Sequence, residues 1–401
     1  MSGPNDQTSD RPVLPEPDVT RVLPRDAQDT SAARSTEIRV TGEINLGPPL
    51  SAGDIGTLGP YRVVRELGRG GMGSVYLAID TRLDRKLALK VMLPQLAADP
   101  VASQRFLREA RATAKVTNDN VVTVYEADER DGVTYIAMQF LQGYPLDEYL
   151  RKKGRPGISQ IIRIGRETAS GLAAAHKTGL IHRDIKPANL WLEAPKGRVK
   201  VLDFGLAKPV DGDVEVSQSG MILGTPAYMS PEQARGLKLD GRSDVFSLGG
   251  VLYYLCTGRF PFEGPTPMAV LTALAVDEPP PVRELNPAVP PPLADLIHQM
   301  LAKIPDKRPR SADDVVQRLR KIAEDLAQSA ATMSLTALPD RDPFADLDMT
   351  AVVPFTVATT APVTSEPVSK WVWVAGGAVA TALLFLVVLI LTTRVVGLWA
   401  K

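Results

Sequence analysis

The sequence predicts an α+β protein with a strand-rich front, a helix-rich back and one membrane-spanning helix near its C-terminus. Three observations support this expectation. Apolar runs with strand-like alternation begin at Tyr61, and apolar residues recur at helical spacing after Pro100. Residues 371–393 form an uncharged stretch that is apolar on every side, long enough for a helix to cross a bilayer.

Composition is that of a globular protein without net charge. The 401 residues include 46 Lys plus Arg and 46 Asp plus Glu, so nothing indicates nucleic acid as a partner. The one cysteine, Cys256, lies in an apolar run and is expected to be buried. The N-terminus has no basic segment leading into an apolar one, so we expect no signal peptide and a cytoplasmic body.

Two segments have the composition of disordered chain. Residues 1–58 are rich in Pro, Ser, Thr, Asp and Arg and have few aromatic residues, so they cannot bury enough apolar surface to fold. Residues 329–369 lose periodicity and resemble a flexible linker. Residues 59–328 are therefore predicted to form the folded domain.

The strand-rich front contains a glycine-rich loop. LGRGGMGSVY, residues 67–76, carries Gly68, Gly70 and Gly73 in GxGxxG spacing, and glycine lets backbone amides approach a phosphate closely. The residues that follow have a strand pattern, whereas a dinucleotide fold would need them to open a helix. The loop is therefore predicted to be a flap between two antiparallel strands.

The next strand and the following helix supply a charged pair. Ala88 and Lys90 share a strand face, so a small side chain can pack on a base while the lysine reaches its phosphates. Nineteen residues later, Glu109 lies at the margin of an apolar helical stripe. Because a buried lysine needs a counter-charge, we predict an ion pair between Lys90 and Glu109.

Five further motifs follow in the helix-rich back. In chain order they are HRDIKPANLWL (182–192), DFG (203–205), PAYMSPEQA (226–234), SDVFSLG (243–249) and KRP (307–309). Together with the glycine-rich loop, Lys90 and Glu109, they resemble the eukaryotic-like Ser/Thr protein kinases of bacteria, from about Tyr61 to about Leu326. The resemblance implies a bilobal protein-kinase fold, with a small antiparallel-sheet lobe that carries one main helix and a larger helical lobe.

The resemblance also implies a reaction and a role for each motif. The protein would transfer the γ-phosphate of ATP to Ser or Thr hydroxyls of protein substrates. Asp184 would orient the acceptor hydroxyl and take its proton, and Lys186 would face the γ-phosphate. Lys90, held by Glu109, would contact the α- and β-phosphates.

Metal and nucleotide sites follow from the same resemblance. Asp203 and Asn189 would hold Mg²⁺, with Mn²⁺ as an alternative, through carboxylate and amide oxygens. Met138 would be the gatekeeper ahead of the hinge that binds adenine. The full set expected to bind ATP is Leu67, Gly68, Arg69, Gly70, Gly71, Met72, Gly73, Ser74, Val75, Ala88, Lys90, Met138, Phe140 and Leu141.

The segment after DFG is expected to regulate the kinase. Ser217 and Ser219 are candidate autophosphorylation sites, because a phosphate there would meet Arg183 through charge-assisted hydrogen bonds. Thr225 is a third candidate, although in the family this position helps to shape the acceptor site.

Several conspicuous residues have structural interpretations. His182 is expected to be a core histidine, and His176 and His298 show no metal-ligand spacing. Glu232 and Arg308 are predicted to form an ion pair that holds the helical lobe. Residues 278–293 are proline-rich, and we favour a connector between late helices over a polyproline ligand.

Alternatives exist for the function. A pseudokinase scaffold would keep the fold and signal by binding, but every position that carries chemistry is intact. A small-molecule phosphotransferase would share the metal and base chemistry, yet it would not need the long segment between DFG and SPE.

The apolar stretch is expected to anchor the protein. A buried core helix is the alternative, but such helices usually keep a polar stripe. We expect residues 370–394 to span the cytoplasmic membrane once, with a short tail at 395–401 and the kinase domain in the cytoplasm. Gly376 and Ala380 have a small-xxx-small spacing that would suit a homodimer in the membrane.

Overall fold

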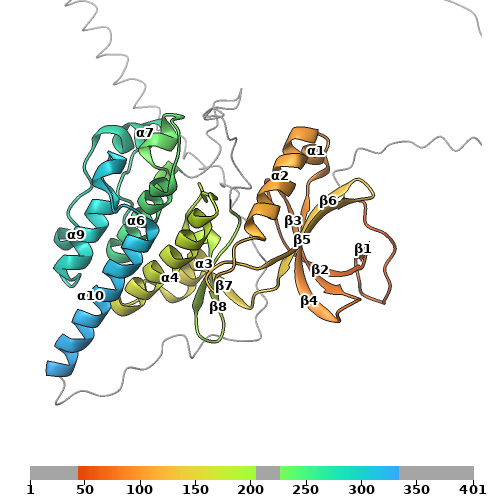
Figure 1. Ribbon diagram of the computed structural model, residues 1–401, viewed down its shortest axis with the longest axis horizontal. Coiled ribbons are helices and arrows are strands. Elements are labelled where there is room, and N and C mark those ends of the chain that lie inside the picture. The colour runs from red at the N-terminus through yellow and green to blue at the C-terminus, as the bar shows by residue number, and fades with distance from the viewer. Residues whose placement is uncertain (1–43, 205–225, 334–401) are drawn as a thin grey trace, which may run out of the picture. The chain divides into compact units, whose positions relative to one another are not determined.

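The computed structural model describes residues 44–204 and 226–333. Within them a strand-rich part is followed by a helix-rich part (Figure 1). We call residues 44–138 the small lobe, residues 139–142 the hinge segment, and the described residues from 143 to 333 the large lobe. The predicted α+β class and its two lobes are confirmed.

A six-stranded antiparallel sheet forms most of the small lobe, in the spatial order β1-β2-β3-β4-β6-β5. Its strands are β1 (Gly56–Leu58), β2 (Tyr61–Gly70), β3 (Gly73–Asp80), β4 (Arg85–Met92), β5 (Val124–Arg130) and β6 (Val133–Gln139). The short helix α1 (Pro94–Ala97) leads into α2 (Pro100–Thr113), which packs on β5 and β6. The Asp99 side chain caps α2 by accepting a hydrogen bond from the Val101 amide at 2.9 Å.

Strand β4 divides its side chains between the two faces of the sheet. Leu87 and Leu89 belong to one apolar cluster, and Ala88 and Met92 belong to another. Because successive side chains of a strand point to opposite faces, Lys90 shares the face of Ala88. The predicted common face of these two residues is confirmed.

The folded part begins earlier than residue 59. Gly47 and Thr57 exchange two backbone hydrogen bonds, of 2.8 and 3.0 Å, and β1 pairs with β2. Leu58 is buried. The expected disorder of residues 44–58 is therefore wrong, because a short edge strand is held by backbone pairing and needs few apolar side chains. Residues 1–43 lie outside the described part.

A second, three-stranded antiparallel sheet and a set of helices form the large lobe. The strands are β7 (Gly143–Pro145), β8 (Leu190–Glu193) and β9 (Arg198–Val201). The α-helices are α3 (Leu146–Lys153), α4 (Ile158–Lys177), α5 (Pro231–Ala234), α6 (Gly241–Thr257), α7 (Pro267–Val276), α8 (Val282–Leu285), α9 (Pro291–Met300) and α10 (Ala312–Met333), and the 3₁₀ turns are η1 (Pro187–Asn189), η2 (Pro226–Tyr228) and η3 (Pro305–Lys307).

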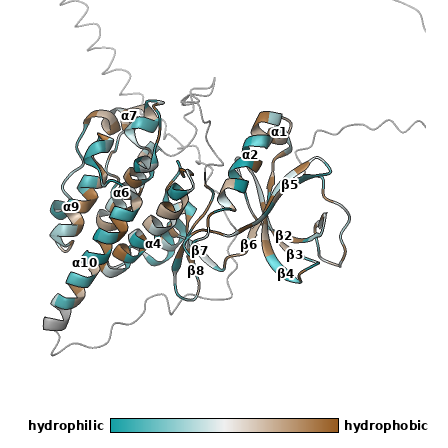
Figure 2. Ribbon diagram, viewed as in Figure 1, coloured by the Kyte–Doolittle hydropathy of each residue, from teal (hydrophilic) through white to brown (hydrophobic). Residues whose placement is uncertain are grey.

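Helix α4 is the central contact of this lobe, since it packs against α6, α10 and β9. Most of α6 is buried, including Cys256 as predicted, and burial raises the pKa of its thiol to about 12. Helix α10 alternates hydrophilic and hydrophobic patches along its length, as a helix with one buried face does (Figure 2). It ends at Met333, beyond the expected boundary at residue 328.

A buried ion pair links α5 to Arg308, which lies between η3 and α10. Arg308 Nη1 and Nη2 donate to the two carboxylate oxygens of Glu232 at 2.6 and 2.8 Å, and the Arg308 side chain is fully buried. Ser243 donates a further hydrogen bond to the same carboxylate. The predicted structural pair is confirmed.

The proline-rich segment at 278–293 packs into the lobe. It contains α8 and the start of α9, and Val282 and Val289 are fully buried. The Tyr253 hydroxyl donates to the carbonyl of Pro280 at 3.0 Å. The segment is therefore the predicted connector between helices.

None of the helices within residues 44–204 and 226–333 combines the length and the apolar character that a bilayer span requires. The predicted span at 370–394 and most of the predicted linker lie outside this described part.

Removing Arg308 should destabilise the large lobe strongly. Arg308→Met leaves the Glu232 carboxylate buried without its cation, which is expected to cost about 3 to 5 kcal/mol of unfolding free energy. Urea unfolding measures this loss. Arg318→Met is the control, because Arg318 pairs with Asp314 on an exposed surface and should cost less than about 1 kcal/mol. Equal losses in the two variants would contradict the assignment.

Candidate active site

The glycine-rich loop is a tight turn between β2 and β3. Gly70 pairs with Gly73, so Gly71 and Met72 form the turn itself. A Cβ on Gly73 would lie 2.1 Å from the carbonyl oxygen of Val91, so the neighbouring β4 backbone requires glycine there. The predicted flap between antiparallel strands is confirmed.

Apolar residues of the predicted base site form one cluster. Those already expected from the sequence are Leu67, Val75, Ala88, Met138 and Leu141, all of them buried, with Phe140 packed against them. Two large-lobe residues, Trp191 and Leu202, belong to the same cluster. Neither was predicted from the sequence, although Trp191 interrupts an aliphatic strand two residues after Asn189.

A buried aspartate holds the HRD loop by its backbone. Asp244 accepts hydrogen bonds from the amides of His182 and Arg183, both at 2.8 Å. His182 is fully buried, and its Nε2 donates to the carbonyl of Leu202 at 2.7 Å. Burial lowers the pKa of His182, which favours the neutral form of its ring. The expected structural role of His182 is confirmed.

Asp184 lies between two of its predicted partners. Lys186 Nζ is 2.7 Å from Asp184 Oδ2, and Asn189 Nδ2 donates to the same oxygen at 3.0 Å. Asn189 Nδ2 also donates to the Asp184 carbonyl at 2.7 Å. Because the amide nitrogen of Asn189 is engaged with Asp184, its amide oxygen is directed elsewhere.

Lys90 and Asp203 extend this group across the two lobes. Lys90 Nζ lies 2.7 Å from Asp203 Oδ1, and the two side chains are 6% and 14% exposed. The amide of Leu202 donates to the Asn189 carbonyl at 3.0 Å, which holds Asp203 next to Asn189. Five predicted residues, from segments far apart in the sequence, are therefore brought together.

The predicted pair between Lys90 and Glu109 is not formed in this conformation. Among the described residues, Lys90 pairs with Asp203 instead, and Oε2 of Glu109 is buried without a hydrogen-bond partner. Burial raises the pKa of Glu109 to about 7, although Arg183 and arginines of α2 oppose the rise. The prediction fails because two carboxylates compete for one ammonium group, and spacing in the sequence does not rank them.

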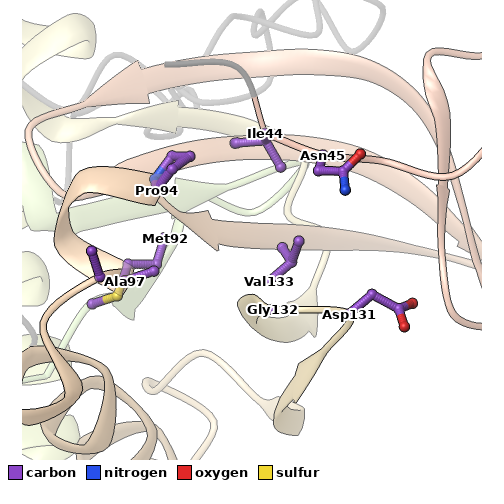
Figure 3. A pocket seen from close by; sticks show the side chains of 9 residues that line it. Ile44, Asn45, Met92, Pro94, Ala97, Asp131, Gly132 and Val133 are labelled. Carbon is purple, nitrogen blue, oxygen red and sulfur yellow. The ribbon is translucent and has the colours of Figure 1, made fainter. Parts of the chain in front are cut away.

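A hollow of about 290 Å³ lies outside this group, at the end of β4 (Figure 3). Met92, Pro94 and Ala97 line it on one side, and residues 131–133 line the other (Figure 3). None of the residues predicted to bind ATP lines this hollow. It is therefore separate from the group around Asp184 and Asp203.

Histidines and acidic residues form no metal-binding cluster within the described ranges, 44–204 and 226–333. His176 Nε2 lies 2.7 Å from Asp244 Oδ2, and His298 Nε2 accepts from the Val282 amide at 3.0 Å. Oxygen donors suited to a hard cation are instead found on Asp203 and Asn189.

The predicted regulatory residues Ser217, Ser219 and Thr225 lie outside the described residues. The described part of the chain continues from Pro226 with the 3₁₀ turn η2. Ser230 is the N-cap of α5 and forms a capping box, in which its Oγ accepts a hydrogen bond from the Gln233 amide at 3.4 Å. The serine of the SPE motif, Ser230, thus has a structural role, since its hydroxyl accepts a hydrogen bond from a backbone amide in the first turn of α5.

Comparison with known proteins identifies the family. The protein kinase domain model matches residues 61–319. The chain belongs to the protein kinase family. The crystal structure of the Mycobacterium tuberculosis PknI kinase domain is similar, with a TM-score of 0.54 and 28% identity, over 68% of this chain and 99% of that one.

Curated relatives are bacterial serine/threonine-protein kinases. Identity is 40% to PknA of Mycobacterium tuberculosis, over 63% of this kinase and 59% of PknA. It is 36% to PrkC of Bacillus subtilis, over 64% of this kinase and 39% of PrkC. It is 40% to Pkn1 of Myxococcus xanthus, over 62% and 36% of the two chains. The matched part thus spans less than two thirds of each relative.

The environment of Glu109 should make stability depend on pH. Its pKa lies near 7 in the folded kinase and at its ordinary value of 4.5 when unfolded, so the folded state binds more protons between these values. The free energy of unfolding should therefore fall as pH rises from about 4.5 to about 7. Glu109→Gln should remove this slope and be more stable than wild type at pH 8.

Urea unfolding at pH 5 and pH 8 measures the effect. Glu129→Gln, on an exposed part of β5, is the control and should keep the wild-type slope. If Glu109→Gln is no more stable than wild type at pH 8, the buried, partner-poor environment of Glu109 is wrong.

Proposed function

We propose that this kinase transfers the γ-phosphate of Mg·ATP to Ser or Thr hydroxyls of protein substrates. The observation that carries the proposal is the single group formed by Asp184, Lys186, Asn189, Asp203 and Lys90, joined by contacts of 2.7 to 3.0 Å. The curated relatives bear the name serine/threonine-protein kinase, which supports the acceptor class.

Asp184 is the group that acts on the acceptor. Its carboxylate accepts hydrogen bonds on Oδ2 from Lys186 and Asn189, which fix its position. A carboxylate held in this position orients a Ser or Thr hydroxyl and takes its proton as the new P–O bond forms. Lys186 also offers positive charge to the transferred phosphoryl group.

Asp203 and Asn189 fit a divalent cation. A carboxylate and an amide oxygen are the hard donors that Mg²⁺ or Mn²⁺ accepts, and Asn189 is turned by its bonds to Asp184 so that its oxygen is available. A cation bound there would supply positive charge to the phosphate oxygens of ATP. Lys90 would then exchange its contact with Asp203 for the phosphates and Glu109.

A pseudokinase scaffold is the alternative function. It would retain the lobes and the buried Asp244 contacts, but it would have no need for Lys186 and Asn189 to hold the Asp184 carboxylate. The polar contacts around Asp184 therefore favour an enzyme.

Asp184→Asn should abolish phosphoryl transfer and leave Mg·ATP binding within a few fold of wild type. The amide keeps the shape but cannot take the acceptor proton. Transfer to a generic protein substrate and calorimetric ATP binding measure the two effects. Asp119→Asn, at an exposed surface pair, is the control. Turnover by Asp184→Asn near the wild-type rate would contradict the role of Asp184.

We also propose that residues 370–394 anchor the kinase in the cytoplasmic membrane, with the kinase domain on the ATP-containing side. The support is the uncharged apolar run between Lys370 and Arg394, which has Trp371 and Trp373 at one end. A tether of about 40 residues would keep the domain near membrane-held protein substrates, or near a second copy of itself.

Deleting residues 371–401 should move the protein from the membrane to the soluble fraction. Cell fractionation detects this shift, and Gly376→Ala is a control that keeps the apolar run intact. Full-length protein found in the soluble fraction would contradict the anchor without affecting the role of Asp184.

A further inference from the structure

Strand β8 contacts the hinge segment at both ends of that segment. Trp191 Nε1 donates to the carbonyl of Gln142 at 3.0 Å. Gln139 Nε2 donates to Glu193 Oε1 at 3.1 Å. Gln139 and Gln142 are the first and last residues of the hinge segment, so two side chains of one large-lobe strand hold both of its ends.

The backbone strengthens the contact at the Gln142 end. The carbonyl of Gln142 also accepts a hydrogen bond from the Ala194 amide at 3.0 Å. Gly143 follows with a φ of +114°, and a Cβ there would lie 2.1 Å from the Leu192 carbonyl oxygen. Immediately after the hinge segment, the backbone therefore passes so close to β8 that only glycine fits at position 143.

Trp191 also faces the predicted base site. Leu190 and Leu192 belong to the core of the large lobe, whereas Trp191 belongs to the cluster of Leu67, Val75 and Ala88. A buried indole needs a partner for its N–H group, and here that partner is a hinge carbonyl. One side chain thus has its ring beside the base site and its polar atom on the hinge segment.

We propose that Trp191 and Glu193 form a clamp that positions the hinge segment for the base of ATP. The inference rests on the proposed function, since it concerns the nucleotide of that reaction. A hinge already fixed in place loses less conformational freedom when the base binds, so the clamp raises affinity without touching the phosphates. Trp191 and Glu193 are positioning residues, not catalytic ones.

A simpler interpretation makes Trp191 only a packing residue. In that case its ring would matter and its N–H group would not. Trp191→Phe separates the two interpretations, because it keeps an aromatic ring in the cluster and removes the hydrogen bond to Gln142. Glu193→Ala tests the other end of the clamp without changing the cluster.

The expected result is a loss specific to the base. Trp191→Phe and Glu193→Ala should each weaken Mg·ATP binding by roughly five-fold, as loss of one hydrogen bond implies. Binding of Mg·tripolyphosphate, which has phosphates and no base, should not change. Hydrogen exchange of the hinge amides should be faster in both variants than in wild type.

The double variant tests whether the two contacts act together. If Trp191 and Glu193 hold one element, the loss in the double variant should be smaller than the product of the two single losses. Arg198→Ala, on the neighbouring strand β9 and paired with exposed Asp119, is the control and should bind ATP as wild type does.

Calorimetry on the full chain gives a clear decision. ATP affinity of Trp191→Phe within two-fold of wild type, with unchanged hinge exchange, would overturn the clamp. Equal losses for ATP and tripolyphosphate would also overturn it, because they would indicate a general structural change. If wild type itself failed to bind ATP, the proposed function would fail, which is a separate outcome.

Discussion

The active site depends on the buried carboxylate of Asp244. It accepts hydrogen bonds from the amides of His182 and Arg183, and it lies 2.7 Å from His176 Nε2. A buried carboxylate is tolerated only when hydrogen-bond partners replace its hydration water. Losing any of these contacts would leave part of the buried charge unpaired, so the charge of Asp244 stabilises the positions of all three partners. Helix α6, which carries Asp244, thereby fixes the loop that presents Asp184.

From Asp244, a series of hydrogen bonds leads to the residues predicted to act on the substrate and the metal. The HRD loop positions Asp184, and the 3₁₀ turn that follows brings Asn189 back to it. The amide of Leu202, the residue before the DFG motif, bonds to the same turn. Each step uses a backbone group on at least one side. Backbone contacts depend little on side-chain flexibility, which suits a reaction whose catalysis is mainly positioning.

Local patterns in the sequence predicted much of this fold and site. Alternation in β4 placed Ala88 and Lys90 on one face, and the strand after the glycines excluded a dinucleotide turn. The edge strand at 56–58 was missed because its pairing uses backbone atoms that any sequence carries. Trp191 was missed because its role depends on Gln142, which is far away in the sequence and acts through its carbonyl.

The ion pair of Lys90 could not be predicted from the sequence, because two carboxylates compete for it. Lys90 has two candidate carboxylates, Asp203 and Glu109, and in this structure its ammonium group lies 2.7 Å from Asp203 Oδ1. Desolvation is the further factor: Glu109 is buried, and this burial raises its pKa to about 7, so its charged form is costly unless a cation lies beside it. Charge added at Asp203 by a cation would reverse the balance, since it would repel the ammonium group of Lys90 and leave Glu109 as its remaining carboxylate. A nucleotide complex with a cation at Asp203 would therefore favour a pair between Lys90 and Glu109.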